Sequence, residues 1–168
     1  MENLIYFNKD LRDVDAKMRK KLGIRGRRAV DLASMGLPIA PGFIIDSELT
    51  KKLPQINLKE MLKTHIDKLA KETKKDFGDP KKPLLLKVVL SSDLNVPNFP
   101  SIHNIGLNDK TVIGFGQYTG ADFAYGEYRF LLRSIGTKVC GIPEADFNAI
   151  EGKVAKPKAA DYKKIVDN

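Results

Sequence analysis

The segment between Asn57 and Pro80 most constrains the fold, because it carries the clearest helical pattern in the chain. Its apolar residues recur at three- and four-residue intervals, the spacing of one helix face: Leu58, Leu62, Ile66 and Leu69. Asn57 is a favourable N-cap, and Glu60 three residues later completes a capping-box pattern. Gly78 and Pro80 then end the helix. The sequence therefore predicts a helix over residues 57–75 that buries one side against other elements.

Strand-like and helical segments alternate along the rest of the chain. Short apolar runs predict strands at Gly42–Ile45 and Leu84–Leu90, and residues 91–104 predict a loop. Further helices are predicted over residues 10–22, 27–35, 109–118 and 119–135, with Gly36 and Gly136 as stop signals. The first of these helices has an apolar stripe at Leu11, Val14, Met18 and Leu22. The last has inward residues at Ala124, Tyr128, Leu131, Leu132 and Ile135. This order predicts an α/β or α+β fold with one small sheet flanked by helices.

The composition fits one globular domain. The chain has 168 residues, of which 42% are hydrophobic and 30% charged. The single cysteine, Cys140, excludes an internal disulfide framework, and two histidines leave no metal-site pattern. No apolar run is long enough to cross a bilayer and no signal peptide is visible, so we expect a cytoplasmic protein with no membrane partner. We expect one domain over residues 1–150 and an extended or frayed Lys-rich tail over 151–168.

Positive charge is concentrated before and inside the second predicted helix. The net charge is +8, and seven cations lie between Asp15 and Asp31 with no acid among them: Lys17, Arg19, Lys20, Lys21, Arg25, Arg27 and Arg28. Such a cluster repels itself unless an anion lies near. We expect five of these residues to contact an anionic partner: Lys20, Lys21, Arg25, Arg27 and Arg28. A solvated basic face with no partner is the alternative interpretation.

Four stretches, in this order, resemble the N-terminal region of the pyruvate phosphate dikinase family. The first runs from Leu22-Gly23-Ile24-Arg25-Gly26 to Gly36-Leu37-Pro38-Ile39-Ala40-Pro41-Gly42-Phe43. The second is Phe77-Gly78-Asp79-Pro80 with Pro83-Leu84-Leu85-Leu86, and the third is Asn104-Ile105-Gly106-Leu107-Asn108-Asp109. The fourth is Phe123-Ala124-Tyr125-Gly126-Glu127-Tyr128-Arg129-Phe130-Leu131. This resemblance implies the first subdomain of an ATP-grasp module, in truncated and degenerate form.

The resemblance also implies where a nucleotide would bind. Arg25 stands where the family has a phosphate-contacting lysine, between Gly23 and Gly26 of a glycine-rich turn. On the strand, Val89 stands where the family has a phosphate-contacting arginine, and Lys87 is the nearest replacement cation. We therefore expect Gly23, Arg25, Gly26 and Lys87 to be the nucleotide- or phosphate-binding residues. The family's acidic metal ligands and phosphocarrier histidine would lie beyond this chain, so no catalytic or metal-binding residue is expected.

Turn and packing residues of the family are thus kept while charge-bearing residues are lost. We expect a non-catalytic remnant, or pseudoenzyme, that acts as a binding or assembly subunit through its basic surface, with a protein partner or larger assembly. One alternative is a nucleotide-binding subunit of a split phosphotransferase that is completed in trans. Another is an RNA- or DNA-binding module. No cofactor is required by these readings, and ATP binding stays open.

Overall fold

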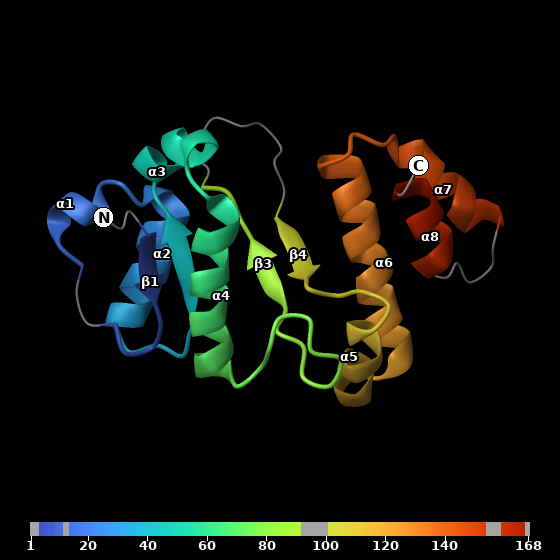
Figure 1. Cartoon of the computed structure of the whole chain (residues 1–168), viewed down its shortest axis with the longest axis horizontal. Coiled ribbons are helices and arrows are strands. Elements are labelled where there is room, and N and C mark those ends of the chain that lie inside the picture. The colour runs from blue at the N-terminus through green and yellow to red at the C-terminus, as the bar shows by residue number, and fades with distance from the viewer. Residues whose placement is uncertain (1–3, 12–13, 92–100, 154–158, 167–168) are drawn as a thin grey trace. The chain divides into compact units, whose positions relative to one another are not determined.

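The computed structural model describes residues 4–11, 14–91, 101–153 and 159–166. These residues form two compact units (Figure 1). The first comprises the described residues up to Lys74 with Leu90 and Ser91, and the second comprises Lys75–Val89 and the described residues from Ser101 onward.

The first unit contains a two-stranded antiparallel sheet. Strand β1 (Leu4–Phe7) pairs with β2 (Gly42–Ile45) in the register Leu4↔Ile45 to Phe7↔Gly42. A Cβ atom on Gly42 would lie 2.5 Å from the ring of Phe7, so the glycine gives this ring room to lie across the partner strand. The predicted strand at Gly42–Ile45 is therefore confirmed, and β1 is its unpredicted partner.

Helices α1 (Ala16–Arg19) and α2 (Gly23–Ser34) follow β1 in sequence, and α3 (Ser47–Lys52), the 3-10 helix η1 (Leu53–Gln55) and α4 (Leu58–Thr73) follow β2. The predicted helix over residues 10–22 is wrong in extent. Of the described residues between 10 and 22, only Ala16–Arg19 is helical. Its apolar stripe is nevertheless inside: Val14 and Leu22 are buried with Ile5 and Val30. A short helix and its flanking turns thus fill the same core that one longer helix would fill.

The predicted helix over residues 57–75 is confirmed as α4. Asn57 caps it by accepting a hydrogen bond from the backbone N–H of Glu60 at 3.3 Å, and its own amide donates to the Glu60 carboxylate at 3.1 Å. The helix contacts the sheet through polar and aromatic groups. Tyr6 donates to Glu72 at 2.5 Å, and the Lys68 ammonium lies 3.8 Å from the centre of the Tyr6 ring.

The second unit is built on a second antiparallel pair and a helical hairpin. Strand β3 (Leu86–Val88) pairs with β4 (Ile102–Ile105), and α5 (Thr111–Thr119) leads into α6 (Ala121–Lys138). Strand β3 is shorter than the predicted 84–90 strand. The first three residues of β4, Ile102–Asn104, lie in the segment 91–104 that was predicted as a loop, and the middle of that segment lies outside the described residues. The predicted inward residues of α6 form the core with Val112 of α5: Ala124, Tyr128, Leu131 and Leu132 are buried, and Ile135 packs against them.

Two expectations near the C-terminus are wrong. Gly136 does not stop α6, which continues to Lys138. The glycine stands inside the helix because its missing side chain leaves room for the buried ring of Phe147. The segment from Glu151 onward is not simply extended. Helix α7 (Glu144–Lys153) includes its first residues and α8 (Ala159–Val166) follows, with Val166 packed against the same core.

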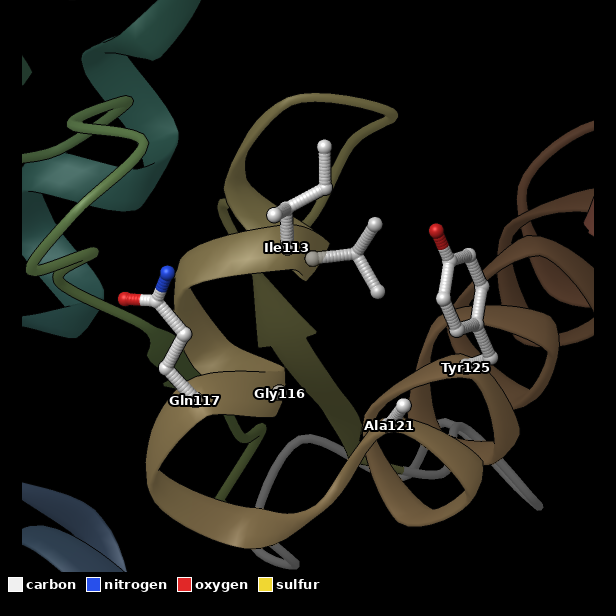
Figure 2. A pocket seen from close by; sticks show the side chains of 6 residues that line it. Ile113, Gly116, Gln117, Ala121 and Tyr125 are labelled. Carbon is white, nitrogen blue, oxygen red and sulfur yellow. The ribbon is translucent and has the colours of Figure 1, made fainter.

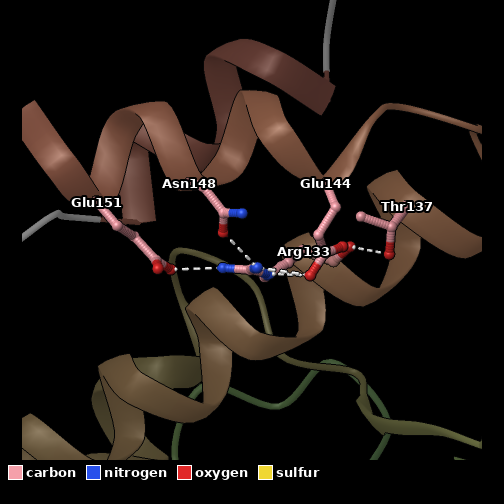
Figure 3. A network of polar contacts seen from close by, with 5 residues as sticks. All are labelled: Arg133, Thr137, Glu144, Asn148 and Glu151. Carbon is pink, nitrogen blue, oxygen red and sulfur yellow. Dashed lines mark hydrogen bonds and ion pairs between the residues drawn. The ribbon is translucent and has the colours of Figure 1, made fainter.

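Arg133 of α6 connects this helix to α7 (Figure 3). Its guanidinium donates to Glu144 at 2.9 and 2.5 Å, to Glu151 at 2.8 Å and to the side-chain oxygen of Asn148 at 2.7 Å. All three acceptors lie one turn apart on the same side of α7, so a single planar fork can bind them together.

The predicted mixed α+β class is confirmed. The expectation of one small sheet is wrong, because β1–β2 and β3–β4 form two separate antiparallel pairs. No described helix is long and apolar enough to cross a membrane.

Candidate anion-binding surface

The cation-rich segment forms the turn between α1 and α2 and the first turns of α2. Lys20 is the C-cap of α1, and Gly23 begins α2 with a left-handed φ of 61°. The second predicted helix was expected to start near Arg27, after the glycines. It starts four residues earlier, at Gly23. Arg25 and Gly26 lie inside this helix, not in a loop before it.

Two cations of the segment are neutralised by acids from elsewhere in the first unit. Arg19 forms an ion pair with Asp31 of α2, and Lys21 forms one with Glu48 of α3 at 2.7 Å. The hydrogen bond from Lys21 holds the pKa of Glu48 below its ordinary value, and the same bond raises the pKa of Lys21. These two cations therefore have partners within the fold, which the local run of bases in the sequence does not reveal.

Four other cations of the segment are exposed: Lys17, Lys20, Arg25 and Arg28. Within the described part of the chain, none of these four forms an ion pair with an acidic side chain. Arg27 is half-buried. Of the five residues predicted to contact an anionic partner, Lys20, Arg25 and Arg28 are the ones presented to solvent without such a pair.

Gly26 is buried, and its environment explains why a glycine stands there. A Cβ atom would lie 3.1 Å from Cβ of Leu22 and 3.3 Å from the side chain of Ile44 on β2. The inner side of α2 thus approaches the sheet closely at this position. Gly26 has a packing contact of its own, independent of any ligand.

The other predicted phosphate-binding residue, Lys87, belongs to the second unit. It is exposed on β3, and the strand ends one residue later at Val88. Val89 is 39% exposed and follows the strand. The first unit therefore brings Gly23, Arg25 and Gly26 together on one helix, whereas Lys87 is placed only within its own sheet.

Sequence reasoning missed an apolar groove in the second unit, between α5 and α6 (Figure 2). It has a volume of about 340 Å³ and six lining residues: Val112, Ile113, Gly116, Gln117, Ala121 and Tyr125. Small residues at positions 116 and 121 form its floor, and Ile113 and Tyr125 stand beside it, 59% and 40% exposed. Ile113 lies off the core stripe of α5, and this was the one signal in the sequence that could have indicated the groove.

Charged groups in the described ranges do not gather into a metal site, since no cluster of three or more His, Cys, Asp or Glu residues is present there. The candidate surface is the cation-rich segment of α1 and α2, which offers positively charged side chains and the N-terminal backbone of α2.

Comparison with known proteins gives one consistent result. The chain is 38% identical over 145 residues to the pyruvate, phosphate dikinase of Treponema pallidum, a match that covers 86% of this chain and 16% of that protein. It is 33% identical to the chloroplastic enzyme of Flaveria trinervia, over 84% of this chain and 16% of the relative. It is also 33% identical to the Rickettsia bellii enzyme, over 89% of this chain and 18% of the relative. The chain thus spans about a sixth of the length of these relatives, and no family model matches it.

Proposed function

The chain belongs to the pyruvate, phosphate dikinase family, as its sequence motifs predicted, and matches one segment of the longer enzymes. We propose that it is a non-catalytic member that binds an anionic partner as a subunit of an assembly. The binding surface is the cation-rich segment of α1 and α2. In this proposal the chain recognises a partner and carries out none of the chemistry of the longer enzymes. Its binding surface is the part of the chain where positive charge is densest.

The observation that carries the proposal is the unequal pairing of the cations. Arg19 and Lys21 have acidic partners within the unit, whereas Arg25 and Arg28 are exposed on α2 with no ion pair among the described residues. Exposed like charges close together raise the local potential and attract an anion. Arg25 lies in the first turn of α2, where the positive end of the helix dipole adds to its charge, and Arg28 lies one turn further along.

One observation supports a loss of phosphotransfer. Val89 stands at the position where the family resemblance implies a phosphate-contacting arginine, and a valine side chain supplies neither charge nor hydrogen bonds. Phosphoryl transfer depends on electrostatic stabilisation of the phosphate by such charged groups.

The catalytic question is tested by incubating the chain with radiolabelled ATP, Mg²⁺, pyruvate and phosphate. We expect neither phosphoenolpyruvate nor labelled protein. Formation of either product would contradict the non-catalytic assignment and favour the alternative, a nucleotide-binding subunit of a phosphotransferase. In a second assay, the chain is mixed with a dikinase from which the corresponding first segment has been deleted. Recovery of activity in this mixture would show that the chain completes a split phosphotransferase in trans.

The binding question is tested by replacing Arg25 and Arg28 with alanine. The matched control is Lys59→Ala with Lys71→Ala, which removes two exposed cations from α4 of the same unit. We expect the arginine variant to lose at least tenfold in affinity for an acidic peptide probe and the lysine variant to lose little. Equal effects of the two variants would indicate that only the net charge matters and that no surface is specialised.

RNA or DNA binding is the remaining alternative. A single-stranded nucleic acid would give a steep salt dependence, because log affinity falls against log salt concentration with a slope of about 0.7 per phosphate contact. Titration of a single-stranded oligonucleotide at several salt concentrations therefore distinguishes this alternative from binding to protein.

A further inference from the structure

Along the outer face of α2, basic side chains are followed by apolar side chains. Arg25, Arg28, Leu32 and Met35 are exposed at intervals of three and four residues, so they follow one side of the helix. The inner side is the buried one, formed by Gly26, Val30 and Ala33. Positive charge therefore occupies the first half of the outer face, and apolar surface occupies the second half.

The apolar half consists of three large hydrophobic residues that are all exposed. Met35 is 74% exposed, Leu32 is 42% exposed, and Leu37 just beyond the helix is 43% exposed. In the described part of the first unit only one other large hydrophobic residue, Leu58, is similarly exposed. Single exposed hydrophobics are ordinary, whereas a group of them at one helix end indicates a contact surface. The flexible thioether of Met35 suits such a surface because it adapts to the shape of a partner.

From this juxtaposition we infer that the outer face of α2 docks a protein segment that carries carboxylates beside apolar side chains. The inference rests on the proposed function and names the partner class. The carboxylates would pair with Arg25 and Arg28, and the apolar side chains would cover Leu32 and Met35. At 1.5 Å per residue, Arg25 and Met35 are about 15 Å apart along the helix, so the segment must span two to three helical turns.

Nucleic acid fits this face less well. Sequence-tolerant binding of single strands combines cations with exposed aromatic side chains on which bases stack. In the described first unit the aromatic side chains are half-buried, and none is among the exposed large hydrophobics. Leu32 and Met35 would remain uncovered against a phosphate backbone. An acidic and apolar protein segment satisfies both halves of the face.

The test uses two synthetic 18-residue peptides and the full chain. In the first peptide, glutamates precede leucines spaced at three and four residues; in the second, glutamine replaces every leucine. Fluorescence anisotropy then gives the affinity of each peptide and of an 18-nucleotide RNA. We expect the leucine peptide to bind at least tenfold more tightly than the glutamine peptide. Leu32→Gln with Met35→Gln should abolish that difference, whereas the control Leu58→Gln should preserve it.

The outcomes separate this inference from the proposed function. Equal affinities for the two peptides, or no binding of the leucine peptide, would overturn the inference. So would RNA that binds more tightly than either peptide and is unaffected by the Leu32→Gln, Met35→Gln variant. In each case a loss of anion binding on Arg25→Ala, Arg28→Ala would leave the proposed function intact. If that arginine variant changes the binding of no probe, the proposed function itself fails. Circular dichroism melting of each variant verifies that the fold is retained.

Discussion

Helices α2 and α6 are built alike on the inside and differ on the outside. Each has a buried glycine where a neighbour approaches closely, Gly26 against Ile44 and Gly136 against Phe147. On its outer side α6 has Arg133, which is bound by carboxylates and an amide of α7. The arginines on the outer side of α2 have no ion pair among the described residues. The comparison indicates that Arg133 belongs to the fold, whereas Arg25 and Arg28 are available to a partner.

The strongest test of the shared inside is Gly136→Ala. The new Cβ would lie 2.5 Å from Cζ of Phe147, and that ring is fully buried, so it cannot move freely away. Overpacking of this kind typically costs about 1–3 kcal/mol. Urea unfolding of the variant should therefore show a clearly lower midpoint with an unchanged slope.

Gly126→Ala in the same helix is the matched control. Its Cβ would meet only the Arg129 guanidinium, at 3.9 Å, so the gain in helix propensity of roughly 0.5–1 kcal/mol should appear as stabilisation. If both alanine variants were equally stable, close packing at Gly136 would be contradicted.

Next in size is the effect of removing the Arg133 fork. Arg133→Ala leaves Glu144, Asn148 and Glu151 without their shared donor, and the Arg133 side chain is only 24% exposed. Networked, partly buried pairs exceed isolated surface pairs, so we expect a loss of roughly 1 kcal/mol. Hydrogen exchange should accelerate in α7 but not in α2. The parallel variant Arg28→Ala should change stability by less than about 0.5 kcal/mol; an equal loss there would mean that Arg28 is also structural.

A smaller effect is expected for Gly26→Ala. The contacts at 3.1 and 3.3 Å are tight but involve side chains, and the gain in helix propensity opposes their cost. We expect a net change within about 1 kcal/mol, measured by urea unfolding. Affinity for an acidic peptide should be unchanged. A loss of this affinity with retained stability would instead show that Gly26 is part of the anion-binding surface.

The same glycines show where sequence reasoning was limited. Gly26 and Gly136 were interpreted as helix breaks, because a glycine within a helical pattern usually weakens it. Their role depends on Ile44 and Phe147, which are distant in sequence or beyond the expected helix end, so no local pattern could reveal it. Local signals succeeded where local physics decides the structure. Asn57 capped α4 as expected, and the apolar spacing of α6 identified its buried side.

The candidate surface was predictable to a similar degree. The run of cations was visible in the sequence, and in the structure Lys20, Arg25 and Arg28 are exposed whereas Lys21 and Arg27 are half-buried. The pairing of Lys21 with Glu48 was not predictable, because it joins α3 to the turn before α2 across 27 positions. Strand β4 was missed for the same reason: its partner β3 lies across a long connection, and its own four residues include His103 and Asn104, which are poor strand signals.

The smallest effect on stability is expected from Glu48→Gln, which removes the acidic partner of Lys21. The lowered pKa of Glu48 means that the pair stabilises the fold above the ordinary glutamate value of 4.5 and that this contribution is lost as the pH falls through the lowered pKa. The raised pKa of Lys21 means that the contribution is also lost as the pH rises above 10.5 through the raised value. Wild-type and variant melting temperatures should therefore differ slightly near neutral pH and converge at both extremes.

The effect of Glu48→Gln on binding has the opposite sign, because the freed Lys21 ammonium adds to the charge beside Arg25 and should strengthen binding of an acidic peptide. Lys21→Met should weaken that binding, and weaker binding by Glu48→Gln as well would show that the intact pair is part of the interface.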